Sequence, residues 1–220
     1  MSDSLVPNRF FFRFSLPCLF RNQLWTAGGA KLEEQYRLVY LGELESRPAI
    51  AEVRAAWNQS GLAFSVRVQG KGQAPWCRAT KLEDSDGFQV WIDTRDVHNV
   101  HRASRFCHRL LFLPCGAGPR LDEPMAQSLS INRAKELPRP IQPEQLKVHS
   151  KKLTDGYLLE AYVSAEALTG FDPQEHPRLG FTYAVIDREL GEQTLTVGSP
   201  MPYQEDPSLW ATLELKRDEE

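Results

Sequence analysis

Two runs of alternating apolar residues, separated by a short polar turn, strongly limit the folds available to this sequence. The runs span residues 49–57 and 62–68, and Asn58-Gln-Ser-Gly61 lies between them. Side chains alternate between two faces along a β-strand, so this pattern predicts a β-hairpin with one buried face. The pair therefore favours antiparallel β structure.

Similar strand patterns recur along the rest of the chain. We expect further strands at residues 9–16, 38–41, 86–93, 106–113, 146–153, 156–163, 179–187, 193–197 and 209–215. Ser164 is expected to cap one short helical turn. The proline-rich region 115–143 predicts an irregular excursion with a short strand at 128–131. Strands that follow strands without crossover helices predict an all-β fold, an antiparallel β-sandwich of the jelly-roll type with immunoglobulin-like layers.

Length and composition are consistent with one such domain. The chain has 220 residues, of which 41% are hydrophobic, and this is enough for one buried core. We expect an N-terminal arm at 1–24, the β-sandwich at 25–216 and a charged tail at 217–220. A net charge of −3 offers no basic surface for nucleic acid, and no run approaches the ~20 apolar residues of a membrane span.

The cysteines and the N-terminus bear on the compartment. Cys18, Cys77, Cys107 and Cys115 contain no C-x-x-C pair, which favours free thiols in a reducing compartment over a disulfide framework. Residues 10–20 are apolar but interrupted by Arg13, and they lack the basic n-region of a signal peptide. The cytoplasm is slightly favoured over secretion, and the compartment stays open.

The order of motifs resembles the family 9 carbohydrate-binding modules and their DOMON-like relatives across residues 25–216. The resemblance lies in six features: the hairpin with Trp57 before its turn, the loop residue Trp76, the strand Asp86-Gly-Phe-Gln-Val-Trp-Ile-Asp93, the segment Gly156-Tyr-Leu-Leu-Glu-Ala161, the strand from Gly180 to Asp187 and the segment from Asp206 to Leu215. It implies a β-sandwich that binds a glycan or a small polyhydroxylated ligand.

In sugar-binding members of that family, two aromatic rings clamp the end of a glycan. The resemblance implies Trp76 as the first ring and Tyr203 near the second, although a tryptophan usually stands there. Gln89 occupies the position of a family glutamate. Aromatic rings stack on the apolar face of a sugar, and planar polar groups bond its hydroxyls. Trp91, which points away from the core side of its strand, and Arg109, which can bond an acidic ligand, complete the ligand-binding set.

Two metal sites are also candidates. Family relatives often hold structural calcium, and the oxygen-rich candidates here are Asp84, Asp86, Asp93 and Asp96. A transition metal is a second hypothesis, with candidate ligands His98, His101, Cys107 and His108. Their spacing matches no standard zinc pattern, and neighbouring strand residues point to opposite faces. A polar loop with an inward Cys107 is therefore favoured, and no cofactor beyond structural calcium is expected.

Catalytic motifs are missing from the sequence. It contains no Gly-x-Ser-x-Gly elbow, no phosphate-binding glycine loop and no His-Glu-x-x-His motif. The leading hypothesis is therefore a non-enzymatic carbohydrate-binding module. The alternatives are a structural or protein-interaction module of the same fold that has lost sugar binding, and a metal protein built on the loop from His98 to His108.

Overall fold

The computed structural model describes residues 10, 12–78 and 80–217. The strands are β1 Ser15–Phe20, β2 Ala51–Asn58, β3 Gly61–Gln69, β4 Gly87–Asp93, β5 Cys107–Ala117, β6 Glu123–Leu129, β7 Leu146–Leu153, β8 Gly156–Ser164, β9 Arg178–Asp187, β10 Gly191–Thr194 and β11 Ala211–Lys216. The helices are single 3-10 turns: η2 Glu34–Tyr36, η3 Gly42–Glu45, η4 Pro143–Gln145, η5 Ala165–Ala167 and η6 Pro207–Leu209. In the described part of the chain, no helix has the length and apolar character needed to cross a membrane.

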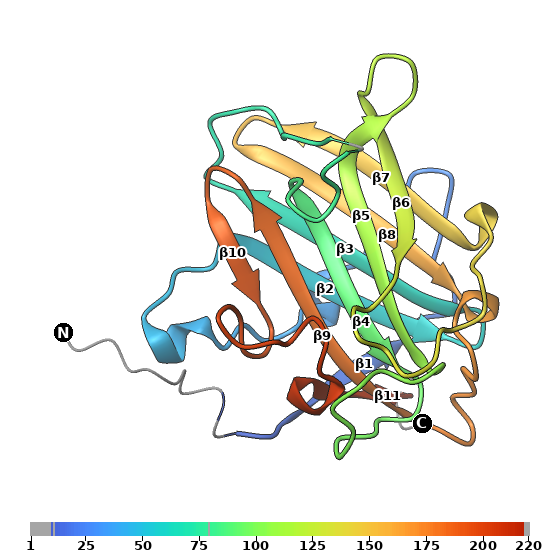
Figure 1. The fold of residues 1–220 in the computed structure, drawn as a ribbon. Coiled ribbons are helices and arrows are strands. Elements are labelled where there is room, and N and C mark those ends of the chain that lie inside the picture. Colours follow the sequence, from blue (N-terminus) through green and yellow to red (C-terminus); the bar gives the residue numbers. More distant parts are fainter. Residues whose placement is uncertain (1–9, 11, 79, 218–220) are drawn as a thin grey trace.

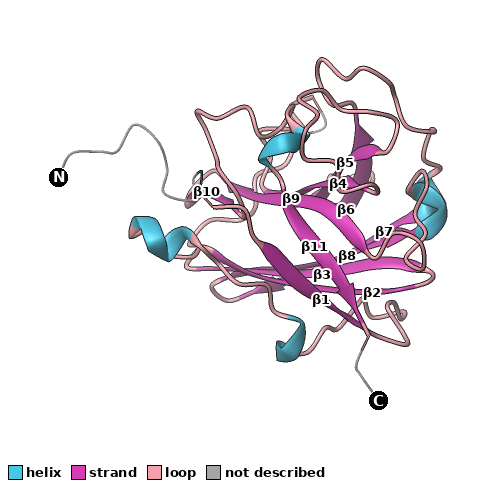
Figure 2. Cartoon of the chain, turned by 90° about the horizontal axis from the view of Figure 1, so that it is seen from below, coloured by secondary structure: helices cyan, strands magenta, loops and turns pink. Residues whose placement is uncertain are grey.

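The strands form one sheet that folds into two layers. The order is β6-β5-β4-β9-β11-β1-β2-β3-β8-β7, with β10 paired to β9. Strand β1 pairs in parallel with β11 and β2, whereas the other pairs are antiparallel. Figure 1 shows β4, β5, β6 and β9 in front of β2, β3 and β8, and Figure 2 shows the two layers from below. The outermost strands β6 and β7 lie against each other, so the sheet is nearly closed.

The main core lies between these layers, because alternate side chains along each strand point into the space between them. Phe88, Val90 and Ile92 of β4 point inward and are fully buried. The Phe64 ring on β3 lies 5.5 Å from Phe88 and 6.0 Å from Phe181 of β9, so aromatic contacts join the layers. The inward side of β4 is therefore structural, and its outward side is free for another role.

Most of the expected strands are confirmed. The hairpin is β2 and β3, with Ala51 opposite Val68 and Asn58 opposite Gly61. The expected strands at 86–93, 146–153, 156–163 and 179–187 correspond to β4, β7, β8 and β9. The helical turn is η5, where the backbone N–H of Glu166 donates to Ser164 Oγ at 3.2 Å.

Three local predictions were wrong. The first strand spans Ser15–Phe20 and passes through Pro17, which pairs with Glu214 of β11 before β2 joins the sheet. Residues 38–41 form no strand, and the neighbouring Arg37 makes an isolated bridge to Arg54. Region 115–143 is more regular than expected, because β5 continues past Pro114 and β6 pairs with it. Residues 1–9 and 11 of the expected arm and 218–220 of the expected tail lie outside the described residues.

Candidate functional site

The outward side of β4 carries a buried polar and aromatic cluster. Gln89 and Trp91 are fully buried there, and Arg109 on β5, opposite Trp91, is 4% exposed. Arg109 Nη2 donates to Gln89 Oε1 at 2.7 Å, and its guanidinium lies 5.1 Å from the centre of the Trp91 ring. The Arg109 Nε atom is buried without a hydrogen-bond partner among the described residues. This arrangement fixes the guanidinium over a ring and leaves one donor unused.

Glu83 connects this cluster to the surface. Its carboxylate lies 3.3 Å from Arg109 Nη2, and its side chain is 59% exposed. Its backbone carbonyl accepts a hydrogen bond from Gln89 Nε2 at 3.1 Å. The pair of Glu83 and Arg109 is therefore a planar, charged group at the edge of the buried cluster, and such groups bond hydroxyls well.

Tyr203 covers the same cluster from the loop that precedes η6. Its ring packs edge-on against Trp91 at 5.4 Å, and it is only 1% exposed. Its hydroxyl donates to Glu192 Oε1 at 2.6 Å, and burial raises the pKa of Tyr203, with the charge of Glu192 adding to the effect. The indole N–H of Trp91 donates to the Gln204 carbonyl at 3.1 Å. Tyr203 thus points into the molecule in this structure and does not line an open cleft.

Trp76 is the more accessible of the two predicted clamp rings. It is half-buried, and the guanidinium groups of Arg78 and Arg188 lie 5.1 and 4.9 Å from its ring centre. Its backbone N–H donates to Asp86 Oδ2 at 2.8 Å, and its carbonyl accepts from the Asp86 N–H at 2.8 Å. Asp86 therefore fastens the Trp76 loop to the start of β4.

The other contacts of Asp86 explain its complete burial. Lys71 Nζ lies 3.0 Å from Asp86 Oδ2 and 2.9 Å from Asp187 Oδ1. Burial alone would lower the Lys71 pKa, but hydrogen bonds to Asp187 and Asp86 outweigh it, so the net pKa is raised and the ammonium stays charged. Asp86 also accepts from the Arg188 N–H at 2.7 Å. Lys71 thus supplies the positive charge that these buried carboxylates require.

The carboxylates proposed for calcium are not brought together. Asp84 is exposed, Asp86 bonds Lys71, and Asp93 at the other end of β4 accepts from the N–H groups of Arg95 and Val97. Asp96 accepts from Thr212 and lies 2.8 Å from His98 Nε2. Within residues 10, 12–78 and 80–217, no group of three or more His, Cys, Asp or Glu side chains is arranged to hold a metal ion.

The residues proposed for a transition metal are dispersed as well. His101 is exposed and contacts Asp206 Oδ2 at 3.0 Å. Cys107 is buried, and burial raises its pKa to about 12. His108, which points to the opposite side, is 1% exposed, and its Nε2 accepts from the Thr169 N–H at 2.9 Å. Each of these side chains has a local structural partner.

Comparisons with known proteins bear on the fold. No protein-family model matches the chain, and no curated protein matches it in sequence. A family 9 carbohydrate-binding module from Caldicellulosiruptor kristjanssonii, solved with cellotriose, superposes with a TM-score of 0.59 at 12% identity, over 94% of this chain and 95% of that chain. The same organism's family 9 module with glucose gives 0.56 at 11% identity, over 94% and 97%.

A third structure agrees with these two. A Bacteroides uniformis protein to which carbohydrate binding has been ascribed gives a TM-score of 0.55 at 11% identity, over 93% of this chain and all of that one. This chain has the fold of a family 9 carbohydrate-binding module. The resemblance in sequence motifs is thereby confirmed at the level of the fold.

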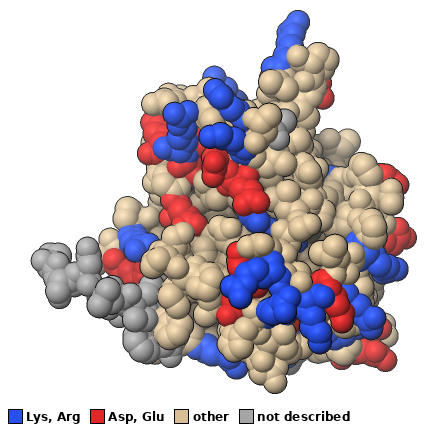
Figure 3. All heavy atoms as spheres, viewed as in Figure 1, with Lys and Arg blue, Asp and Glu red and all other residues tan. Residues whose placement is uncertain are grey.

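Sequence reasoning missed several residues of this region. Glu83, Arg188 and Glu192 contact the predicted residues Arg109, Trp76 and Tyr203, and Lys71 neutralises Asp86. These partners come from separate loops, and no spacing pattern links them. The only hint in the sequence is Lys71, which lies in the loop before Asp86 and β4. Lysines in loops before strands with acidic ends are too common to predict an ion pair. Figure 3 shows acidic and basic side chains lying close together on this face.

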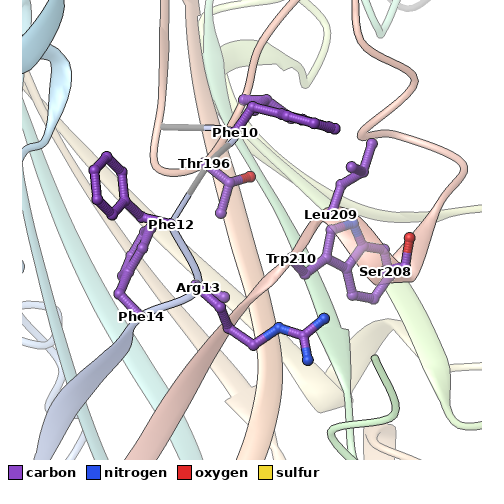
Figure 4. A pocket seen from close by; sticks show the side chains of 10 residues that line it. Phe10, Phe12, Arg13, Phe14, Thr196, Ser208, Leu209 and Trp210 are labelled. Atoms are coloured by element: carbon purple, nitrogen blue, oxygen red, sulfur yellow. The ribbon is translucent and has the colours of Figure 1, made fainter. Parts of the chain in front are cut away.

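A separate hollow of about 290 Å³ lies between the N-terminal segment and the turn before β11. Figure 4 shows Phe10 and Leu209 across from Arg13, with Trp210 between them. Phe10 is 44% exposed and Phe12 is 62% exposed, whereas Trp210 is buried. The hollow thus has a buried aromatic floor, and the exposed side chains of Phe10, Phe12 and Arg13 lie at its rim.

Proposed function

We propose that this protein is a non-catalytic carbohydrate-binding module. The observation that carries the proposal is the superposition, over nearly the whole chain, on modules solved with cellotriose and glucose. The local chemistry supports it, because a half-exposed tryptophan lies in the same loop as Glu83, which is paired with Arg109. A ring for stacking and planar groups for hydroxyls are what a sugar requires.

The binding site that we propose has one exposed ring. A sugar stacks on Trp76, and its hydroxyls bond Glu83, Arg109 and the neighbouring arginines. Tyr203 is buried, so it supports the cluster by packing against Trp91 instead of serving as a second exposed platform. Gln89 orients the guanidinium through its 2.7 Å hydrogen bond.

The test is calorimetric titration of the purified protein with cellotriose and with glucose. We expect saturable binding by the wild type and at least tenfold weaker binding by Trp76→Ala, which corresponds to a loss of ~1.4 kcal/mol. Glu83→Gln keeps a planar group but loses its charge, so a smaller loss is expected.

Trp25→Ala is the matched control. Trp25 is also half-buried, but it packs at 6.2 Å from Tyr162 of β8, on the other layer. Its substitution should leave sugar affinity unchanged. Equal affinities of Trp76→Ala and the wild type would contradict the proposed site, and the absence of binding to any sugar on a glycan array would contradict the function.

A second candidate function is a protein-interaction module that has kept the fold. It is supported by the burial of Tyr203 and Gln89, which fills the face that the clamp would use, and by the exposed side chains of Phe12, Val39 and Leu44. Phe12, Val39 and Leu44 line one largely apolar hollow of about 330 Å³. A wild type that binds no glycan would favour this function over the first.

A further inference from the structure

Two of the four cysteines lie in direct contact, although they are far apart in the sequence. Cys77 follows Trp76 in the loop before β4, and Cys115 lies near the end of β5. Their sulfur atoms are 2.6 Å apart, and both residues are half-buried. Cys18 and Cys107 are buried and belong to different apolar clusters. The contact is therefore specific to one pair.

The backbone on both sides holds the two thiols in place. A Cβ atom at Gly116 would lie 3.5 Å from Cys77 Cβ, so the strand runs directly beside the loop. The paired backbone hydrogen bonds between Trp76 and Asp86 fix the loop. The other acceptors for the thiols are carbonyl oxygens 3.6 Å away, those of Asp86 for Cys77 and of Pro75 for Cys115. These contacts are too weak to compete with a bond between the sulfurs.

Cys115 is also accessible from outside. It lines a hollow of about 360 Å³ together with Pro75, Leu121 and Tyr157. Its hydrogen bond with Cys77 lowers the Cys115 pKa, while the same bond and then burial raise the Cys77 pKa. In this pair one thiol can ionise while the other donates a hydrogen bond to it. Cys115 lines the hollow, so a thiolate there can reach a small disulfide, and the thiolate is the species that attacks a disulfide.

We propose that Cys77 and Cys115 form a reversible disulfide that ties the Trp76 loop to β5. The oxidant is a small disulfide such as oxidised glutathione. The Cys115 thiolate attacks it, forms a mixed disulfide and releases one thiolate; Cys77 then loses its proton and attacks the Cys115 sulfur, releasing the second. The net reaction converts two protein thiols and one small disulfide into one protein disulfide and two small thiols.

The experiment equilibrates the purified full chain with mixtures of oxidised and reduced glutathione, quenches with acid and alkylates the remaining thiols under denaturing conditions. We expect the oxidised protein to lose two hydrogen atoms in mass and to yield a cross-linked peptide that contains Cys77 and Cys115. Cys18 and Cys107 should be recovered alkylated in the same digest. Excess reduced glutathione should restore all four thiols.

Variants and stability measurements sharpen the test. In Cys77→Ser, Cys115 should accumulate as a stable mixed disulfide with glutathione, because the second attack is lost. Oxidation should raise the melting temperature of the wild type by roughly 5–10 °C, since the bond closes a long loop of the unfolded chain. Free thiols at every glutathione ratio, or mixed disulfides without a cross-link, would overturn the proposal. This outcome is independent of whether the protein binds sugar.

Discussion

A buried aspartate lies at each end of β4: Asp86 directly before the strand and Asp93 as its last residue. The two look equivalent in the sequence, but different groups bind their carboxylates. Asp86 bonds the Lys71 ammonium and the backbone of the Trp76 loop. Asp93 is 2% exposed, and no lysine in the described part of the chain pairs with it; instead the N–H groups of Arg95 and Val97 donate to its two oxygens at 3.0 and 2.9 Å. One carboxylate joins three segments, whereas the other closes a local turn.

The difference appears in the energetics of the two charges. Burial raises the Asp93 pKa, although the hydrogen bonds from Val97 and Arg95 counteract part of the shift. At the Asp86 end, the lysine offsets the cost of burying the carboxylates. Asp86 thus connects segments that are distant in the sequence beside the Trp76 loop, whereas Asp93 stabilises a local turn before the loop from His98 to His108.

The largest effect is expected from Lys71→Met. The substitution removes the ammonium and leaves Asp86 and Asp187 buried without their cation. Breaking a buried ion network in this way costs ~3–5 kcal/mol of unfolding free energy, measured by urea denaturation at pH 7. Lys81→Met, at an exposed lysine of the same loop, is the control and should change stability by less than ~0.5 kcal/mol. Similar losses in both variants would remove the distinction.

A pH effect is expected from the Asp93 end, where His108 lies opposite Ile92. Burial and the positive charge of Arg139 lower the His108 pKa from 6.5 to about 4. The unfolded chain therefore binds a proton at a higher pH than the folded chain does. Stability is full above pH ~6.5 and falls as the pH drops toward ~4, by about 3 kcal/mol in total.

The measurement compares wild type and His108→Gln by urea unfolding at a series of pH values. Glutamine can still accept from the Thr169 N–H but does not titrate. The variant should lose less stability than the wild type between pH 6.5 and 4. Parallel curves for the two proteins would show that His108 is not responsible.

The smallest effect is expected from Asp93→Asn. Asparagine keeps one acceptor and loses the other, which costs about 1 kcal/mol, but it also removes the cost of a buried charge. Because the folded pKa of Asp93 is raised, its charge disfavours folding at neutral pH, and protonation on acidification removes that penalty. The change in unfolding free energy at pH 7 should stay within ~1 kcal/mol. If Asp93→Asn lost as much unfolding free energy as Lys71→Met, the two aspartates at the ends of β4 would be equally important for stability, which would contradict the comparison.

The sequence predicted most of the strands because their signals are local. The hairpin of β2 and β3 and the inward set Phe88, Val90 and Ile92 follow from alternation alone. The sequence predicted only a short strand at 128–131 where β6 spans Glu123–Leu129, and it misplaced β1. Strand β6 is only partly buried and its sequence does not alternate clearly, and β1 contains a proline that the sheet accepts where β2 has not yet joined. Both depend on neighbours far away in the chain.

The all-β class, the hairpins and the outward direction of Gln89 and Trp91 can be predicted from the chain alone, because successive side chains of a strand point to opposite faces. Three contacts could not be predicted in this way: Tyr203 is buried against Trp91, Lys71 neutralises Asp86, and Cys77 touches Cys115. These contacts join loops from separate strands, and the folding of the sheet into two layers sets them. The spacing of residues along the chain does not predict how the sheet folds into two layers, so it does not predict which loops come into contact.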